Sequence, residues 1–187
     1  QNEPGSSMHI HQSVLDAKTG KNVFAGRDGK PSKLFLNHIG GLQRYMSAAL
    51  PFCAPNVNSY RRLVPESDAP TNVHWAHDNR TVSLRVPASN AANLRVENRV
   101  PGADANPYLA FAASLACGYL GMMDKIEPRE EYVGEGYQDR ERPLPKSLMD
   151  SVDNFIRSKG LREALGESFV ETFAAIKRTE YEHRSSV

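Results

Sequence analysis

Two histidines near the start of the chain, His9 and His11, have a spacing that could bring two imidazoles into one small space. If residues 8–13 form a strand, its period of two separates the side chains onto two faces. One face carries His9, His11 and Ser13, and the other carries Met8, Ile10 and Gln12. A Gly-Ser-Ser run at residues 5–7 supplies backbone amides that can approach phosphate or carboxylate oxygens closely. The pattern indicates anion chemistry, although histidines with purely structural hydrogen bonds would give the same spacing.

A second strand with functional side chains is predicted at residues 94–100. There Arg95, Glu97 and Arg99 share one face, although a solvated outer face would look the same. Further arginines lie in residues 58–63 and 79–87, in a protein of net charge only +1. Arginines gathered on short strands and loops, without a general basic surface, favour focused recognition of anions.

Arg80 and Arg85 are five residues apart, so an unbroken strand would point them to opposite faces. We therefore expect Arg80 to lie before the strand that contains Arg85.

Four segments in this order and spacing resemble the carboxy-terminal catalytic region of the glutamine synthetase superfamily. They read PGSSMHIHQS, NSYRRLVPESDAP, NRTVSLRVP and RVENRVPGADANPYLAFAA. Within the superfamily these sequence segments are most similar to those of the γ-glutamylpolyamine synthetases, especially the γ-glutamylputrescine type.

The resemblance implies a metal and nucleotide site. His9 and Glu97 match ligands of the metal ion that binds the nucleotide phosphates, while His11 and Ser13 match positions near ATP. A mixed imidazole and carboxylate ligand set suits Mn²⁺ as well as Mg²⁺. The implied cofactor is therefore Mg²⁺ or Mn²⁺, with ATP as co-substrate.

The resemblance also implies a glutamate site and a group of phosphate-binding arginines. Arg62, Arg99 and the backbone of Gly5 match positions that hold glutamate. Arg80 and Arg85 match arginines that contact ATP, with Arg80 stabilising the phosphoryl group in transfer. Planar guanidinium groups supply the paired donors that carboxylates and phosphates require.

Two loops differ from the sequence typical of enzymes that make glutamine. Asp68 aligns with a glutamate that helps to take a proton from ammonium, and Glu66 lies two residues earlier. Residues 4–7 read Pro-Gly-Ser-Ser where Asn-Gly-Ser-Gly is usual. Both changes suit an acceptor larger than ammonia, although neutral variation in loops would also produce them. Asp68 is thus a candidate catalytic residue.

The implied activity is an ATP-dependent ligase that joins the γ-carboxylate of glutamate to putrescine or a polyamine through a γ-glutamyl phosphate. The alternatives are glutamine synthetase itself, which uses ammonia, and a non-catalytic structural member of the family. Members of the family are more than twice as long as these 187 residues and form rings of subunits. We therefore expect a carboxy-terminal fragment of a homo-oligomer, inactive alone and lacking the amino-terminal metal ligands.

Composition agrees with an ordinary globular domain: 40% of residues are hydrophobic and 24% are charged. The sequence shows no apolar run of about 18 residues, no signal-like segment and no nucleic-acid motif. Cys53 and Cys117 read as buried thiols of a reducing compartment. We therefore expect a cytoplasmic protein that binds neither membranes nor nucleic acids.

The pattern of elements predicts a single α+β domain over residues 1–187, with an antiparallel sheet and helices packed behind it. Strands are expected near residues 7–14, 72–77, 81–86 and 94–100. Helices are expected over residues 34–50, 107–125, 145–158 and 161–182, the second of them largely buried. Residues 127–145 read as a long loop.

Overall fold

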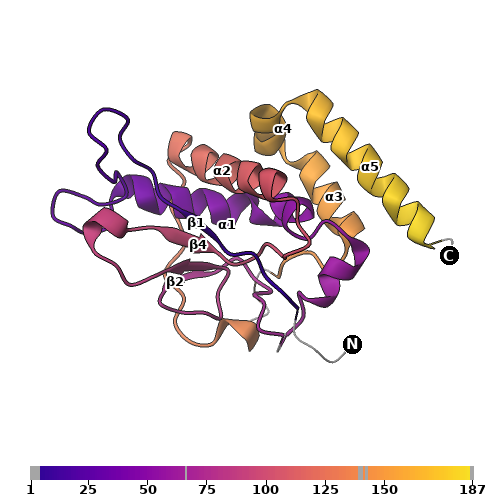
Figure 1. The fold of residues 1–187 in the computed structure, drawn as a ribbon, viewed down its shortest axis with the longest axis horizontal. Coiled ribbons are helices and arrows are strands. Elements are labelled where there is room, and N and C mark those ends of the chain that lie inside the picture. Colours follow the sequence, from indigo (N-terminus) through magenta and orange to yellow (C-terminus); the bar gives the residue numbers. More distant parts are fainter. Residues whose placement is uncertain (1–4, 66, 139–140, 142, 186–187) are drawn as a thin grey trace.

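The computed structural model describes residues 5–65, 67–138, 141 and 143–185, and combines one small sheet with a layer of helices (Figure 1). The strands are β1 (Ile10–Gln12), β2 (Trp75–His77), β3 (Leu84–Val86) and β4 (Val96–Asn98), in the order β1-β4-β3-β2. The α+β prediction is confirmed. The sheet is mixed and not wholly antiparallel, because β4 pairs antiparallel with β1 and β3 while β2 and β3 are parallel.

The two helices that support the sheet begin within one residue of the predicted positions 34 and 107. Ser32 caps α1 (Lys33–Cys53) by accepting a hydrogen bond from the Phe35 amide at 3.2 Å. Asn106 caps α2 (Pro107–Met123) by accepting one from the Tyr108 amide at 3.0 Å, and proline occupies the first helical position.

Three further helices, α3 (Leu148–Arg157), α4 (Lys159–Leu165) and α5 (Glu167–Ser185), lie at one end of the molecule (Figure 1). The predicted single helix over residues 161–182 is wrong, because α4 ends at Leu165 and Gly166 separates it from α5. Gly166 has φ of 91°, a conformation that glycine adopts without strain. Short 3₁₀ turns occur at Val57–Arg61, Ala91–Asn93 and Gly136–Gln138.

α1 and α2 pack closely against each other beside the sheet (Figure 1). Glycines make the close approach possible: a Cβ atom at Gly41 would lie 2.6 Å from the Gly121 Cα. The adjacent glycines Gly40 and Gly41 therefore serve tight packing and do not interrupt α1.

One face of the sheet packs toward the helices through apolar residues and a buried polar chain. Asn98 donates to the Ser114 hydroxyl at 3.1 Å, and that hydroxyl donates to Gln12 Oε1 at 2.7 Å. Because these hydrogen bonds join β4, α2 and β1, they fix which face of the strands packs against the helices and which face remains open for chemistry.

The prediction that α2 is largely buried is wrong for one face. Its small residues pack inward, whereas Tyr108, Leu115 and Tyr119 are exposed in this chain. Cys53 and Cys117 are buried free thiols, as predicted. None of the helices in the described part of the chain combines the length and the apolar character that a transmembrane span requires.

Candidate functional site

The open face of the sheet carries a row of functional side chains from three strands. His11 in β1 lies opposite Glu97 in β4, and Glu97 lies opposite Arg85 in β3. Ile10 and Gln12 are buried on the other face, so the predicted alternation around the histidines is present. Pairing of β4 with two neighbours therefore places Glu97 at the centre of the row.

Glu97 is a buried carboxylate with basic groups around both of its oxygens. Oε1 lies 3.0 Å from His9 Nδ1, 3.0 Å from Arg99 Nη1 and 3.9 Å from His11 Nε2. Oε2 accepts a hydrogen bond from Arg85 Nη1 at 2.9 Å. His9, His11, Glu97 and Arg99 thus converge, and the two predicted metal ligands, His9 and Glu97, lie side by side.

Burial and ion pairing act in opposite directions on Glu97. Burial alone would raise the pKa of the Glu97 carboxyl, but the hydrogen bond from Arg85 and the charges of Arg99 and His9 outweigh it and lower this pKa. Burial, followed by the charge of Arg99, lowers the pKa of His9 despite the nearby carboxylate. At neutral pH the site therefore presents an ionised carboxylate beside a neutral imidazole.

A neutral imidazole and an ionised carboxylate are a suitable donor pair for a divalent cation. The 3.0 Å between His9 Nδ1 and Glu97 Oε1 fits two adjacent ligands that are each about 2.1 Å from one ion. Among the described residues, however, no group of three or more His, Cys, Asp or Glu side chains is arranged to hold a metal ion. His9 and Glu97 could supply part of a metal site, and further ligands would be needed to complete it.

The residues predicted to bind glutamate lie together beside this row. Arg62 donates to the Ser7 hydroxyl at 3.3 Å and to the Val100 carbonyl at 2.5 Å. The Gly5 loop lies directly against Arg62, since a Cβ atom at Gly5 would be 2.8 Å from the Arg62 Cγ. Arg99 follows β4 and is also buried. Pro4, in the same loop, lies outside the described residues.

The remaining predicted residues are more exposed. Arg80 lies in a turn before β3, as predicted, and its side chain is exposed. Asp68 is exposed in the flap segment, with φ of 60°. Ser13 is exposed just after β1, on the same side of that strand as His11. Glu66 lies outside the described residues.

Two residues next to the site have no sequence signal. Asp78 accepts hydrogen bonds from Arg85 Nη2 and from the Ala88 amide, both at 3.0 Å, and so holds Arg85 from the side opposite Glu97. Tyr137 comes from the long loop and donates to the Arg80 carbonyl at 3.3 Å.

Tyr137 also lies within the electrostatic reach of two predicted site residues. Burial raises the pKa of the Tyr137 hydroxyl. The charge of Arg99 lowers this pKa, and the charge of Asp68 raises it. Only the folded chain brings this loop beside Arg80, because nothing in its spacing predicts that position.

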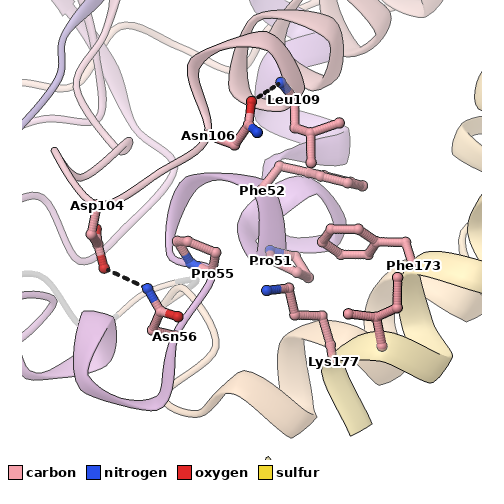
Figure 2. A pocket seen from close by; sticks show the side chains of 10 residues that line it. Pro51, Phe52, Pro55, Asn56, Asp104, Asn106, Leu109, Phe173 and Lys177 are labelled. Atoms are coloured by element: carbon pink, nitrogen blue, oxygen red, sulfur yellow. Dashed lines mark hydrogen bonds between the residues drawn. The ribbon is translucent and has the colours of Figure 1, made fainter. Parts of the chain in front are cut away.

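A separate cavity of about 300 Å³ lies where the end of α1, the start of α2 and the side of α5 meet (Figure 2). Phe52 and Phe173 supply apolar walls, while Asp104 and Lys177 supply charges (Figure 2). Lys177 is already paired with Glu180 at 2.8 Å. None of the ten predicted site residues lines this cavity, so it is distinct from the site around Glu97.

Comparisons with known proteins give one consistent family. A family model described as the glutamine synthetase catalytic domain matches residues 1–187. γ-Glutamylputrescine synthetase PuuA of Escherichia coli strain K12 is 41% identical over 176 residues, covering 94% of this chain and 37% of PuuA. Glutamine synthetase of Pyrococcus abyssi is 41% identical over 187 residues, covering 96% of this chain and 42% of that enzyme.

Relatives named for other acceptors are similarly close. Glutamate–isopropylamine ligase of a Pseudomonas species is 40% identical over 190 residues, covering 97% of this chain and 40% of that ligase. Among solved structures, a GmaS complex with ADP has a TM-score of 0.85 at 29% identity, with 98% of this chain and 44% of that chain covered. The chain therefore spans about two-fifths of the length of these relatives.

Proposed function

The chain belongs to the glutamine synthetase catalytic-domain family, and we propose on this basis that the full-length protein is an ATP-dependent ligase joining the γ-carboxylate of glutamate to an amine. The observation that carries the proposal is the environment of Glu97. A buried carboxylate held among two imidazoles and two guanidinium groups matches a site for phosphates and their cation. In this proposal the protein works in the cytoplasm.

The first step would transfer the γ-phosphoryl group of ATP to the glutamate side chain, since a free carboxylate is a poor acyl electrophile. Bound Mg²⁺ or Mn²⁺, with His9 and Glu97 among its ligands, would neutralise phosphate charge. Arg80 and Arg85 would contact the transferring group and ATP, and His11 and Ser13 would lie near the nucleotide. Gly5, Arg62 and Arg99 would orient glutamate.

The second step would be attack of a neutral amine on the γ-glutamyl phosphate, with release of phosphate. An amine is mostly protonated at neutral pH, so a carboxylate that takes its proton would assist the attack. Asp68 is the proposed base, because it lies exposed in the flap segment within electrostatic range of Tyr137.

For the acceptor we propose putrescine or a related polyamine. Asp68 is one methylene shorter than the glutamate typical of the ammonia-using enzymes, which leaves more room at this position. The relatives named for putrescine, isopropylamine and glutamine synthesis have nearly equal identity to this chain, so overall similarity does not separate them. Ammonia is therefore the second candidate acceptor.

The deciding experiment is a product screen with the full-length protein, glutamate, ATP and Mg²⁺ or Mn²⁺. Putrescine, spermidine and ammonia are compared by phosphate release and by mass spectrometry of the product. We expect the largest kcat/KM with putrescine or spermidine. A larger value with ammonia would assign the protein as a glutamine synthetase. Absence of product with all three would favour a non-catalytic family member. The presence of His9, Glu97 and the arginines at the matching family positions argues against that role.

A further inference from the structure

Arg62, one of the residues proposed to orient glutamate, is a buried cation whose hydrogen-bond acceptors are neutral. It is 8% exposed, and it donates to the Val100 carbonyl at 2.5 Å and to the Ser7 hydroxyl at 3.3 Å. Burial lowers the pKa of Arg62, and the charge of Asp104 is the largest effect that opposes this change. Asp104 therefore acts on a residue of the site, although it is not among the predicted site residues.

One carboxylate oxygen of Asp104 holds the 3₁₀ turn at Val57–Arg61, which ends directly before Arg62. Asp104 Oδ2 accepts a hydrogen bond from the Ser59 hydroxyl at 2.5 Å. The same oxygen accepts a second bond, at 3.3 Å, from the side chain of Asn56, which caps the turn (Figure 2). Because Ser59 is only 5% exposed, water has little access to replace its bond, so the orientation of the turn depends on Asp104.

The other carboxylate oxygen of Asp104 lies on the side of Arg62. A Cβ atom at Gly102 would be 2.5 Å from Asp104 Oδ1 and 3.2 Å from both Nε and Nη2 of Arg62. The carboxylate and the guanidinium therefore border the same small space, which any side chain at residue 102 would fill. Asp104 is thus connected to Arg62 in two ways, through the turn and across this space.

We propose that Asp104 is a positioning residue for Arg62: it fixes the turn before Arg62 and places a negative charge beside the guanidinium. The inference rests on the proposed function, in which Arg62 orients glutamate. Asp104 is exposed, so solvent screens its charge, and the hydrogen bond to the buried Ser59 makes the larger contribution. Without Asp104 the turn and the guanidinium gain alternative orientations, and glutamate binds less tightly.

Steady-state kinetics of the full-length protein, with the amine that gives the most product, test the consequence for glutamate. We expect Asp104→Ala to raise KM for glutamate about tenfold and to change kcat and KM for ATP by less than about twofold, because only glutamate binding is weakened. Asp104→Asn keeps an oxygen that accepts from Ser59 and should raise this KM only about threefold. An unchanged KM for glutamate in Asp104→Ala, or equal rises in both KM values, would overturn the proposal.

Two further variants separate positioning from a general loss of structure. Asp16 is another exposed aspartate that accepts from a hydroxyl, that of Thr19 at 2.8 Å, and Asp16→Ala should leave KM for glutamate unchanged. Ser59→Ala removes the Asp104 hydrogen bond from the donor side. We expect the double variant with Asp104→Ala to have no higher KM for glutamate than Asp104→Ala alone. Additive effects, or an equal rise in Asp16→Ala, would contradict the positioning role.

Crystal structures of the full-length wild type and of Asp104→Ala report the position of Arg62 without depending on activity. We expect the variant guanidinium to move by about 1 Å or more from the Val100 carbonyl, which it contacts here at 2.5 Å. An unmoved guanidinium would overturn the proposal. Absence of product with the wild type would refute the proposed function, and the crystal structures would then decide the role of Asp104 alone. If Asp104→Ala fails to fold, Ser59→Ala provides the same comparison.

Discussion

Acid should destabilise this protein through His38, a histidine in α1 that is not among the predicted site residues. The ring is 1% exposed and packs against Phe24, with ring centroids 5.0 Å apart. Gly118 makes room for it, because a side chain at that position would overlap the imidazole. Neither ring nitrogen has a hydrogen-bond partner among the described residues.

Burial lowers the pKa of His38 from 6.5 to about 4. In the unfolded chain His38 is protonated near pH 6.5, whereas in the folded chain it stays neutral down to about pH 4. The free energy of unfolding therefore falls as the pH falls from about 6.5 to about 4. The pKa shift of His38 corresponds to about 3 kcal/mol in the free energy of unfolding, of which about 2 kcal/mol is lost between pH 7.5 and pH 5.

Equilibrium urea unfolding of the protein and of His38→Leu at these two pH values measures this contribution. The comparison uses the change with pH in each protein, so the packing cost of the substitution cancels. We expect the wild type to lose about 2 kcal/mol more than His38→Leu on acidification. If both proteins lost the same free energy of unfolding, the assignment of this pH dependence to His38 would be refuted.

Four further predictions concern the site and its support. Glu97→Gln should lower the free energy of unfolding by about 3 kcal/mol, because it leaves two guanidinium groups without their buried counter-charge; unchanged urea unfolding would contradict this. Asp68→Ala in the full-length protein should reduce kcat for putrescine more than it raises KM, and unchanged steady-state rates would remove Asp68 from the mechanism. Titration calorimetry should show weak Mn²⁺ binding by the isolated chain, since His9 and Glu97 are an incomplete ligand set; tight binding at one site would reveal ligands not recognised so far. Gly41→Ala should destabilise the fold by about 1–3 kcal/mol, because the new methyl group meets the α2 backbone, and a Tm equal to that of the wild type would show that the helices can separate at little cost.

Local periodicity was enough to predict which side chains share the open face of the sheet. His9 and His11 alternate with Ile10 and Gln12, and Glu97 alternates with Val96 and Asn98, so the face of each strand could be predicted before its pairing was known. The pairing adds what the pattern lacks, since it brings the two strands into the register that sets His11 opposite Glu97.

The parallel pairing of β2 and β3 could not be predicted in the same way. Only residues 78–83 separate the strands, and such a short connection usually makes an antiparallel hairpin. The chain returns within this loop, where Asp78 adopts φ of 45° and accepts hydrogen bonds from Arg85 and Ala88. Asp78 therefore links the unusual connection to the site, a function that only the folded geometry reveals.

The wrong prediction for α2 has a different physical origin. Composition measures how much apolar surface a helix carries, and by that measure α2 is a core helix. Which face of the helix is covered depends on its tertiary contacts, and in this structure the covered face is the one that meets α1. Composition therefore predicts how apolar α2 is, and only its packing against α1 shows which of its faces is buried. For Glu97, in the same way, the strand period predicts the face, but only the folded chain shows that Arg85 and Arg99 pair with its carboxylate at 2.9 and 3.0 Å.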